Sequence, residues 1–279
     1  DQFIEAVATP DGGVAILARF VDQSIDNQLS GRLNVTQLSS DGQILCSPDL
    51  PWNANYWNLS EMEMGLAPDG RIIVARGDHN SIQAEMISVD PEGTINWILD
   101  LHELSDVECY LRVIDLEITH DGRSALCGEI MRSGAPQGMF AASIAQDGTV
   151  EWSQVFATSI AYGFQEGDAA VDTEGNLYVT GDLVNLSFNS TIHVAKMDPD
   201  GNIMWEYNLE EDDTHLFPNE MVVNDKGDVY VGMHYYTSGN DGGFRAIALD
   251  SDGGSKWDEA SCPLPGITSI ISHGLVLAP

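Results

Sequence analysis

Residues 169–209 read AAVDTEGNLYVTGDLVNLSFNSTIHVAKMDPDGNIMWEYNL and contain one complete copy of a repeated unit. Four short apolar runs are joined in two pairs, and each pair turns at an acidic segment that contains Gly175 or Gly201. Such segments suit β-hairpins, because Gly and Asn tolerate a positive φ. Trp205 follows the second glycine by four residues. The stretch is therefore predicted to form a sheet of four antiparallel strands.

The same unit recurs along the chain. Its first hairpin is predicted to turn at Gly12, Gly70, Gly122, Gly175 and Gly227. Its second hairpin is predicted to turn at Gly42, Gly93, Gly148, Gly201 and Gly253, and the residues four positions later are Cys46, Trp97, Trp152, Trp205 and Trp257. We expect the four tryptophans to be equivalent positions that pack between adjacent blades, because burying an indole contributes a large hydrophobic area. A further first-hairpin glycine, Gly274, begins a sixth unit. The spacing of about fifty residues is typical of propeller blades.

The repeat predicts an all-β protein, a β-propeller of four-stranded antiparallel blades with five complete repeats and a partial sixth. A lone sheet cannot bury both faces, whereas sheets packed face to face around an axis can. A stacked solenoid is the alternative, since the period alone does not establish ring closure. We expect one domain over residues 1–279, because no linker interrupts the repeat. Its units are 1–50, 51–104, 105–157, 158–210, 211–262 and the partial 263–279.

Two stretches carry a family resemblance. Residues 171–183 with 191–209 resemble the bacterial seven-bladed β-propeller repeat, and residues 247–257 (IALDSDGGSKW) resemble the tryptophan-docking repeat of quinoprotein-like propellers. Ala248, Asp250, Gly253 and Trp257 follow the order of that docking repeat, although the gap between Asp and Gly is one residue short. The resemblance covers almost the whole chain and implies the propeller fold. It implies no particular activity, because this fold hosts unrelated functions.

The chain is strongly acidic, with 44 acidic against 11 basic residues and a formal net charge of −33. This balance excludes nucleic acid as a partner, because binding phosphates requires Lys and Arg, and it disfavours anionic membrane surfaces. One interpretation is solubility in a saline setting, and the other is cation binding. The candidate Ca²⁺ ligands are the turn residues Asp198, Asp200, Asp250 and Asp252, since hard cations prefer several oxygen ligands. Asp-x-Asp-Gly is also ordinary turn chemistry.

The cysteines and the termini bear on the compartment. Cys46, Cys109, Cys127 and Cys262 lack zinc-site spacing, so they are either buried thiols or up to two disulfides, with Cys46 and Cys262 as the first pair to examine. No run of eighteen apolar residues occurs, so no membrane insertion is expected. Without an initiator Met or a signal peptide, we expect a trimmed product. The predicted location is extracytoplasmic in a bacterium: secreted, periplasmic or at the cell surface.

No reaction signature is present, whether a zinc-protease helix, a nucleophile elbow, a phosphate loop or a dinucleotide fingerprint. The rare residues gather instead in the predicted connections between hairpins, where binding residues tend to lie. The predicted ligand-binding residues are Trp52, Tyr56, Trp57, His215, Phe217, His234, Tyr235 and Tyr236. Aromatic rings among Asn, Asp and Glu suit a glycan or a protein partner. The alternative is that these rings pack down as plugs.

The sequence therefore predicts a non-enzymatic binding or assembly module that acts through its long-connection face, with a protein or glycan partner and no cofactor other than Ca²⁺. A second hypothesis is an enzyme, either a glycan lyase or hydrolase or a quinoprotein-like oxidoreductase. The small number of basic residues argues against a bound quinone cofactor. A third hypothesis is a structural module of a larger surface protein or assembly.

Overall fold

A computed structural model describes residues 2–23, 29–51, 62–77, 84–104, 110–132, 135–156, 166–184, 190–237 and 241–261. Over these ranges the chain forms twenty-one strands and one short 3-10 helix, η1 (Leu101–Leu104). The strands assemble into five antiparallel sheets, one for each predicted complete repeat, and we call these sheets blades 1 to 5. This confirms the all-β propeller fold. The partial sixth unit with Gly274 lies outside the described residues.

Within each blade the strands pair in sequence order. Blade 1 contains β1 (Gln2–Ala8), β2 (Val14–Gln23), β3 (Leu29–Leu38), β4 (Ile44–Cys46) and β5 (Asp49–Leu50). Blade 2 contains β6 (Met62–Leu66), β7 (Ile72–Arg76), β8 (Glu85–Val89) and β9 (Ile95–Asp100). Blade 3 contains β10 (Tyr110–Ile118), β11 (Ser124–Arg132), β12 (Ala135–Ile144) and β13 (Val150–Phe156). Blade 4 contains β14 (Gly167–Val171), β15 (Leu177–Val184), β16 (Ser190–Met197) and β17 (Ile203–Glu211), and blade 5 contains β18 (Thr214–Val223), β19 (Val229–Thr237), β20 (Gly242–Leu249) and β21 (Ser255–Ala260).

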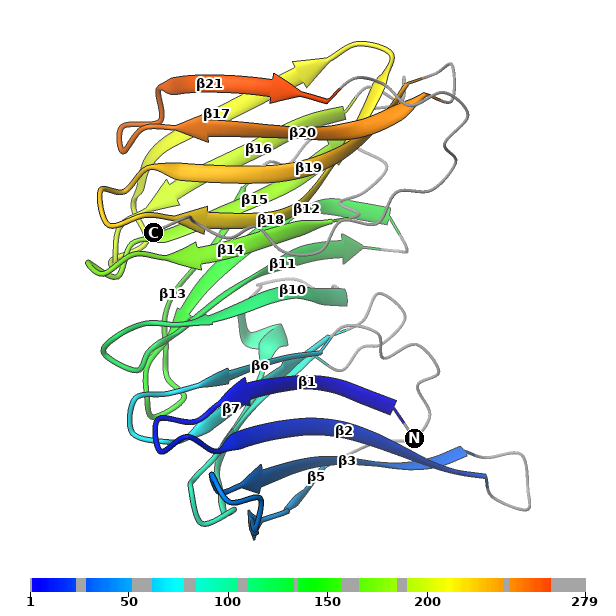
Figure 1. Cartoon of the computed structure of the whole chain (residues 1–279), viewed down its shortest axis with the longest axis vertical. Coiled ribbons are helices and arrows are strands. Elements are labelled where there is room, and N and C mark those ends of the chain that lie inside the picture. The colour runs from blue at the N-terminus through cyan, green and yellow to red at the C-terminus, as the bar shows by residue number, and fades with distance from the viewer. Residues whose placement is uncertain are drawn as a thin grey trace.

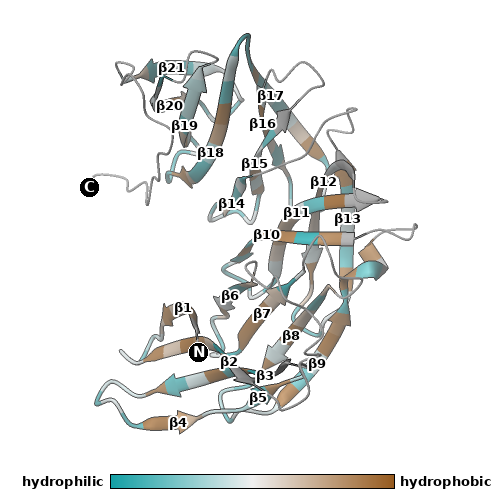
Figure 2. Ribbon diagram, turned by 90° about the vertical axis from the view of Figure 1, so that its right-hand side faces the viewer, coloured by the Kyte–Doolittle hydropathy of each residue, from teal (hydrophilic) through white to brown (hydrophobic). Residues whose placement is uncertain are grey.

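The five blades follow one another along an arc (Figure 2), with the first strand of each blade on the concave side. The described strands form an open arc, because β1 of blade 1 and β18 of blade 5 stand at its two ends rather than side by side. The glycine turns lie along one rim of the arc, and the strand ends remote from these turns lie along the other (Figure 1). We call these the turn rim and the connection rim.

Blade 1 differs from the predicted four strands, because its outer strand is split. Both β4 and β5 pair with β3, and Ser47 and Pro48 separate them. Proline has no backbone N–H to donate to a ladder, so a strand that contains it is interrupted. The Pro48 carbonyl still accepts the Val35 N–H at 3.2 Å, and the Asn34 side chain donates to the Ser47 carbonyl at 3.1 Å. These bonds hold the break against the sheet.

The predicted hairpin glycines have the required backbone conformation. All ten have φ between 78° and 88°, a region that side chains disfavour. At the Gly201 turn, the Gly201 N–H donates to the Asp198 carbonyl at 2.9 Å, and the Asp198 N–H donates to the Asn202 carbonyl at 2.9 Å. The acidic-glycine segments therefore act as hairpin turns, as the sequence predicts.

The apolar core lies between consecutive blades. Ile192 and Val194 of blade 4 pack with Val229, Val231 and Ile247 of blade 5, and all five side chains are fully buried. This explains why the strands read as apolar runs rather than as strict alternation, since both faces of an inner blade are covered. Among the described residues, no helix has the length and apolar character needed to cross a bilayer.

The repeated tryptophans join each blade to the next. The indole Nε1 of Trp97 donates to the Gln146 carbonyl at 3.0 Å, that of Trp152 to the Pro199 carbonyl at 3.0 Å, and that of Trp205 to the Ser251 carbonyl at 2.9 Å. Each acceptor stands two residues before the second-hairpin glycine of the following blade. A Cβ at that glycine would lie only 2.6–2.8 Å from the indole. The glycine is therefore needed both for the turn and for the contact.

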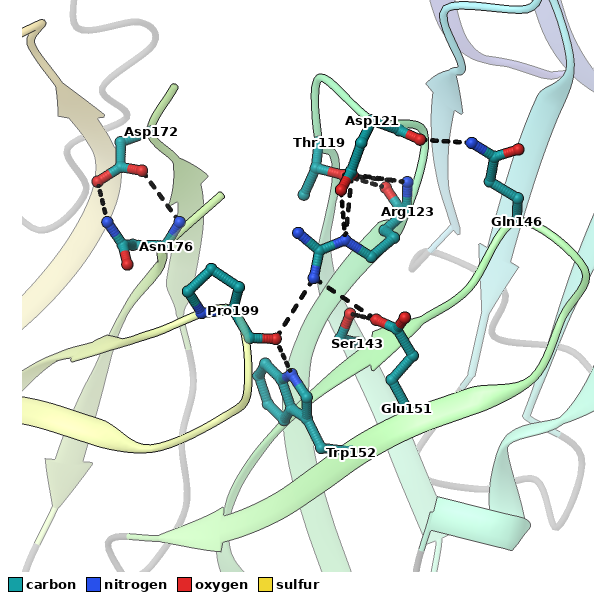
Figure 3. Close-up of polar contacts among 10 residues, drawn as sticks. All are labelled: Thr119, Asp121, Arg123, Ser143, Gln146, Glu151, Trp152, Asp172, Asn176 and Pro199. Atoms are coloured by element: carbon teal, nitrogen blue, oxygen red, sulfur yellow. Dashed lines mark hydrogen bonds and ion pairs between the residues drawn. The ribbon is translucent and has the colours of Figure 1, made fainter. Parts of the chain in front are cut away.

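Two of these joints each contain an arginine that binds the same carbonyl as the indole. Arg123 Nη1 donates to the same Pro199 carbonyl as Trp152, at 3.3 Å, while its Nε is paired with the Asp121 carboxylate (Figure 3). Arg71 has the same position one blade earlier and donates to the Gln146 carbonyl at 2.6 Å. The predicted inter-blade role of Trp97, Trp152 and Trp205 is thus confirmed. Trp257 has the same register but lies on the face of blade 5 turned away from blade 4.

The cysteines are thiols where the structure describes them. Cys46 replaces the tryptophan at the first joint, and its Sγ would lie 3.4 Å from a Cβ placed on Gly93. It is a free thiol among the described residues, and its predicted partner Cys262 lies outside them. Cys127 is a free, fully buried thiol within β11, as expected for a packing residue. Cys109 and Cys262 lie outside the described residues.

Candidate functional site

The predicted ligand-binding residues fall into three groups. Trp52, Tyr56 and Trp57 lie outside the described residues. His215 and Phe217 are in β18, and His234, Tyr235 and Tyr236 are in β19. The prediction that these five lie in connections was therefore wrong: the two strands extend to the connection rim, and only Asp212 and Asp213 separate blade 4 from blade 5.

Tyr235 belongs to the core. It is 7% exposed, packs with the apolar residues between blades 4 and 5, and donates its hydroxyl to the Ser261 carbonyl at 3.0 Å. Side chains alternate between the two faces of a strand, so its neighbours His234 and Tyr236 point the other way. The plug alternative is correct for Tyr235.

The other four rings form one group, which we call the aromatic cluster: His215, Phe217, His234 and Tyr236. Phe217 and His234 are cross-strand partners whose rings stack at 4.8 Å with an interplanar angle of 12°. The His215 ring stacks with that of Phe217 at 6.3 Å, and Tyr236 meets His234 edge-on at 5.4 Å. Except for His234, these side chains are only partly buried. The cluster offers a rigid aromatic surface at the connection rim.

A small cavity of about 210 Å³ lies beside the aromatic cluster, where three first strands reach the connection rim. We call it the mouth cavity. Its polar lining comes from Arg112 of β10, Glu166 just before β14, and Asn219 of β18. Asn219 lies at a register shift in the β18–β19 ladder, between Pro218 and Glu220. A β-bulge of this kind redirects a side chain, and here it turns Asn219 toward blade 4.

A hydrogen-bonded chain links the cavity to the aromatic cluster. Asn219 Nδ2 donates to Glu166 Oε2 at 2.5 Å, and Asn219 Oδ1 lies 2.8 Å from His234 Nδ1. Because the amide oxygen can only accept, the proton of a neutral His234 is on Nδ1, which leaves Nε2 as an acceptor. Glu166 is held from the other side, since its N–H donates to Asp182 Oδ1 at 3.1 Å. The amide thus orients both titratable groups.

Burial shifts these two groups in opposite directions. The pKa of Glu166 is raised by burial, although the Asn219 hydrogen bond and the nearby Arg112 charge oppose this. The pKa of His234 is lowered, also by burial, so the imidazole is neutral near pH 7. Arg112 Nη1 lies 3.7 Å from Glu129 Oε2, so its charge is shared with blade 3. The mouth cavity therefore presents hydrogen-bonding groups with little net positive charge.

An acidic residue recurs on the first strand of every blade. The five are Glu5, Glu63, Asp115, Asp168 and Glu220, each seven residues before the first-hairpin glycine. Three of them accept a backbone N–H from the next blade: Glu5 from Met64 at 2.6 Å, Asp115 from Ala169 at 2.8 Å, and Asp168 from Met221 at 2.5 Å. We call these five residues the axial carboxylates. Glu5, Asp115 and Asp168 join neighbouring blades on the concave side, as the tryptophans do on the outer strands.

The axial carboxylates are crowded. The carboxyl groups of Asp115 and Asp168 share a hydrogen bond, and burial raises the pKa of both. Burial and the charges of Asp115 and Glu5 raise the pKa of Glu117 to about 7. A protonated member relieves the repulsion and keeps a donor for its neighbour. The arrangement is thus a set of inter-blade bonds whose strength depends on pH.

Sequence reasoning missed the axial carboxylates and the residues of the mouth cavity. The signal for the first set was present, because an acid seven residues before each of five glycines is a fixed register in strands that are otherwise apolar. Arg112, Glu166 and Asn219 show no such register. Their meeting depends on strands from three blades.

The predicted calcium ligands lie in two separate turns of the turn rim. Asp198 Oδ1 accepts the Asn202 N–H at 2.8 Å, and Asp250 Oδ1 accepts the Gly254 N–H at 2.8 Å. Both carboxylates therefore stabilise their own turns. Within the described ranges, no group of three or more His, Cys, Asp or Glu side chains is arranged to hold a metal ion. Calcium binding stays a prediction for these turns, and Asp198→Asn with a calcium titration would test it.

Comparison with known proteins agrees on the fold. No family model and no curated protein matches the chain. Among solved structures, a protein of unknown function from Dyadobacter fermentans has a TM-score of 0.53 at 12% identity, over 89% of this chain and 78% of that one. An ulvan lyase of polysaccharide lyase family PL25 has a TM-score of 0.58 at 9% identity, over 93% and 70%. A lignostilbene dioxygenase from Pseudomonas brassicacearum has a TM-score of 0.52 at 11% identity, over 94% and 66%.

These structures are propeller-type folds with four-stranded antiparallel sheets, and they include enzymes. At such low identity the likeness extends to the fold alone. The chain is therefore similar to propeller proteins, and no match assigns it to the bacterial repeat family that its sequence resembles.

Proposed function

We propose that this protein is an extracytoplasmic binding module that takes a neutral glycan at the connection rim, on the aromatic cluster beside the mouth cavity. The observation that carries the proposal is the stack of Phe217 on His234, which is tied through Asn219 to Glu166. Sugar rings pack their apolar faces on aromatic rings, and their hydroxyls need donors and acceptors at set positions. The site offers both within one patch.

The charge of the chain narrows the ligand class. A net charge of −33 repels polyanions, and Arg112 is already neutralised by Glu129 and Glu166. We therefore expect neutral sugar residues rather than uronic or sulfated ones. The substrate of the ulvan lyase is for this reason not carried over to this chain.

The experiment is titration of neutral and anionic oligosaccharides into the wild-type chain and into Phe217→Ala and Tyr236→Ala. Binding of a neutral glycan should weaken at least about tenfold in both variants, since central aromatic contacts contribute most of the affinity. Phe3→Ala is the matched control, because Phe3 is an exposed ring on blade 1, 63% accessible. Equal binding by all variants, with melting temperatures lowered only in the first two, would overturn the proposal.

One observation favours an enzyme as a second candidate. Glu166, with a raised pKa, and His234, with a lowered pKa, lie 3.9 Å apart, and opposite shifts in neighbouring groups suit a general acid and a general base. The reaction would be cleavage of a glycosidic bond, by lysis or hydrolysis. Glu166→Gln separates the two candidates. If the variant still binds the glycan but no longer forms the cleavage product, Glu166 is catalytic. Absence of any cleavage by the wild type leaves the binding module as the function.

A further inference from the structure

Trp257 has the position of a joining tryptophan but joins nothing among the described residues. It pairs with Ala248, and its ring centre lies 6.1 Å from that of Tyr230. Trp205, one blade earlier, likewise lies 6.1 Å from Tyr178, yet Trp205 donates to Ser251 of the next blade. In the part of the chain that the structure describes, the Trp257 indole has no such acceptor, and the residue is 41% exposed.

The sheet face around Trp257 is open as well. Phe244 is 44% exposed, and a cavity of about 430 Å³ lies over Gly232, Phe244 and Ala246. On blade 4 the equivalent face carries Ile192 and Val194, which blade 5 buries completely. The face that is exposed on blade 5 is therefore the face that the following blade buries on blades 1 to 4.

At the opposite end of the arc, the glycine turn of blade 1 contacts no aromatic side chain among the described residues. A Cβ on Gly93, Gly148, Gly201 or Gly253 would meet Cys46 or an indole of the preceding blade at 2.6–3.1 Å. A Cβ on Gly42 would meet nothing within 4 Å, although its φ of 81° is the same. Ile44 and Leu45 beside it are 67% and 57% exposed. The glycine turn of blade 1 thus has space for an aromatic side chain at the position that an indole occupies beside Gly148, Gly201 and Gly253.

These two features cannot satisfy each other, because blades 1 and 5 stand at the two ends of an open arc (Figure 2). We propose that the outward face of blade 5 is a docking surface for one occupant, a further four-stranded blade of this same repeat whose second-hairpin glycine turn receives Trp257. The occupant supplies a carbonyl two residues before its glycine for the indole N–H. The inner strands of this further blade cover Gly232, Ala246 and Phe244. The Gly42 turn has the same chemistry for a blade that precedes β1.

Docking of this kind forms its indole joint away from the middle of the glycan site. Tyr230, next to Trp257, and Tyr236, in the aromatic cluster, are six residues apart on β19, which is about 20 Å along a strand. The joint forms at the turn rim, while the aromatic cluster faces the connection rim. The two surfaces adjoin, because His234 of the aromatic cluster is the cross-strand partner of Phe244. Quenching of Trp257 reports on the joint alone, so the failure of one proposal can be told from the failure of the other.

The test grafts such a blade onto the full chain by inserting a second copy of residues 212–261 directly after Ser261. The emission of Trp257 is read as the difference between each protein and its Trp257→Phe variant. Acrylamide quenching of this difference should fall severalfold in the graft, and the melting temperature should rise by roughly 5 °C or more. Both effects should disappear when the inserted copy of Gly253 becomes Ala, because its Cβ would occupy the place of the indole.

Gly12→Ala in the unmodified chain is the control for backbone strain. Its φ is 83°, and its Cβ would make only an ordinary contact of 3.5 Å with Ser40, so it measures strain without blocking a joint. Unchanged quenching of Trp257 in the graft would overturn the proposal. The proposal would also be overturned if the unmodified chain self-associates and Trp257→Phe does not, because a second copy of the chain would then be the occupant. Increased quenching of Trp257 after removal of residues 262–279 would make that segment the occupant and overturn it too.

Discussion

The indole Nε1 of Trp205 donates a hydrogen bond of 2.9 Å to the carbonyl of Ser251, 46 residues later in the chain. Two earlier joints repeat this geometry at Gln146 and Pro199. One side chain thus buries a large apolar ring between blades and also satisfies a turn carbonyl. The joints are equivalent, so the last one differs from the others only in what covers it.

Trp205→Ala should lower the free energy of unfolding by about 3–5 kcal/mol, because it removes a large ring from an interface and leaves a carbonyl unpaired. Trp257→Ala should cost no more than about 1 kcal/mol, since that ring is 41% exposed. Urea midpoints of the two variants measure the difference. Equal midpoints would contradict the assignment of Trp205 as a joint.

Added salt should stabilise the protein. The net charge of −33 is spread over all blades, and like charges repel over a Debye length of about 8–10 Å at physiological ionic strength. The melting temperature should therefore rise steadily from low to molar sodium chloride. A flat or falling curve would mean that local ion pairs such as Arg245 with Asp258 already compensate the charge.

Stability should fall as the pH rises through the range in which Glu117 titrates. Its pKa is raised from 4.5 to about 7, so between these values the folded chain holds a proton that the unfolded chain has lost. The unfolding free energy then decreases with pH, by up to about 3 kcal/mol across this window. Glu117→Gln should remove this slope and be the more stable protein at pH 8.

The control for Glu117 is Glu92→Gln, an exposed acid in the turn between β8 and β9. Its unfolding free energy should keep the wild-type dependence on pH. If Glu117→Gln also keeps that slope under chemical denaturation from pH 5 to pH 8, the raised pKa of Glu117 is wrong.

Replacing Asp168 by Asn should change the stability little, whereas replacing it by Ala should destabilise the protein. In Asp168→Asn, the amide oxygen can accept the Met221 N–H and the amide nitrogen can donate to Asp115, so both bonds of the protonated carboxyl are kept. Stability near neutral pH should change by less than about 1 kcal/mol and should increase above the wild type at alkaline pH. Asp168→Ala leaves a buried N–H unpaired and should cost about 1–3 kcal/mol. Thermal unfolding at pH 7 and pH 9 measures both, and equal losses in the two variants would refute the inter-blade role of Asp168.

The fold was predictable because its determinants are local and repeat. A glycine with positive φ, such as Gly175 or Gly201, specifies a tight turn from its own backbone freedom, and the apolar runs on each side specify the strands. Five copies in one register made the prediction strong, and the tryptophan four residues after the second glycine already indicated the joints. The split outer strand of blade 1 was signalled only by Pro48, a single residue.

The candidate site was only partly predictable. His215, Phe217, His234 and Tyr236 stood out as rare residues, but the same reasoning also selected Tyr235, because a one-residue offset in a strand moves a ring from the surface to the core. Arg112, Glu166 and Asn219 were missed, since nothing in the local pattern distinguishes them. Each lies in a different blade.

By itself, the sequence determined the four-stranded unit, its number of complete copies, its turns and its joining tryptophans, because these follow from contacts within one repeat or between neighbouring repeats. The tertiary structure decided which polar groups meet at the mouth cavity and how far their pKa values shift, since these depend on packing between strands more than fifty residues apart, such as β14 and β18 at Glu166 and Asn219. It also decided that, among the described residues, Trp257 and Gly42 take part in no inter-blade joint. That outcome depends on how consecutive blades pack, because a joint forms only where the turn of a neighbouring blade covers the ring.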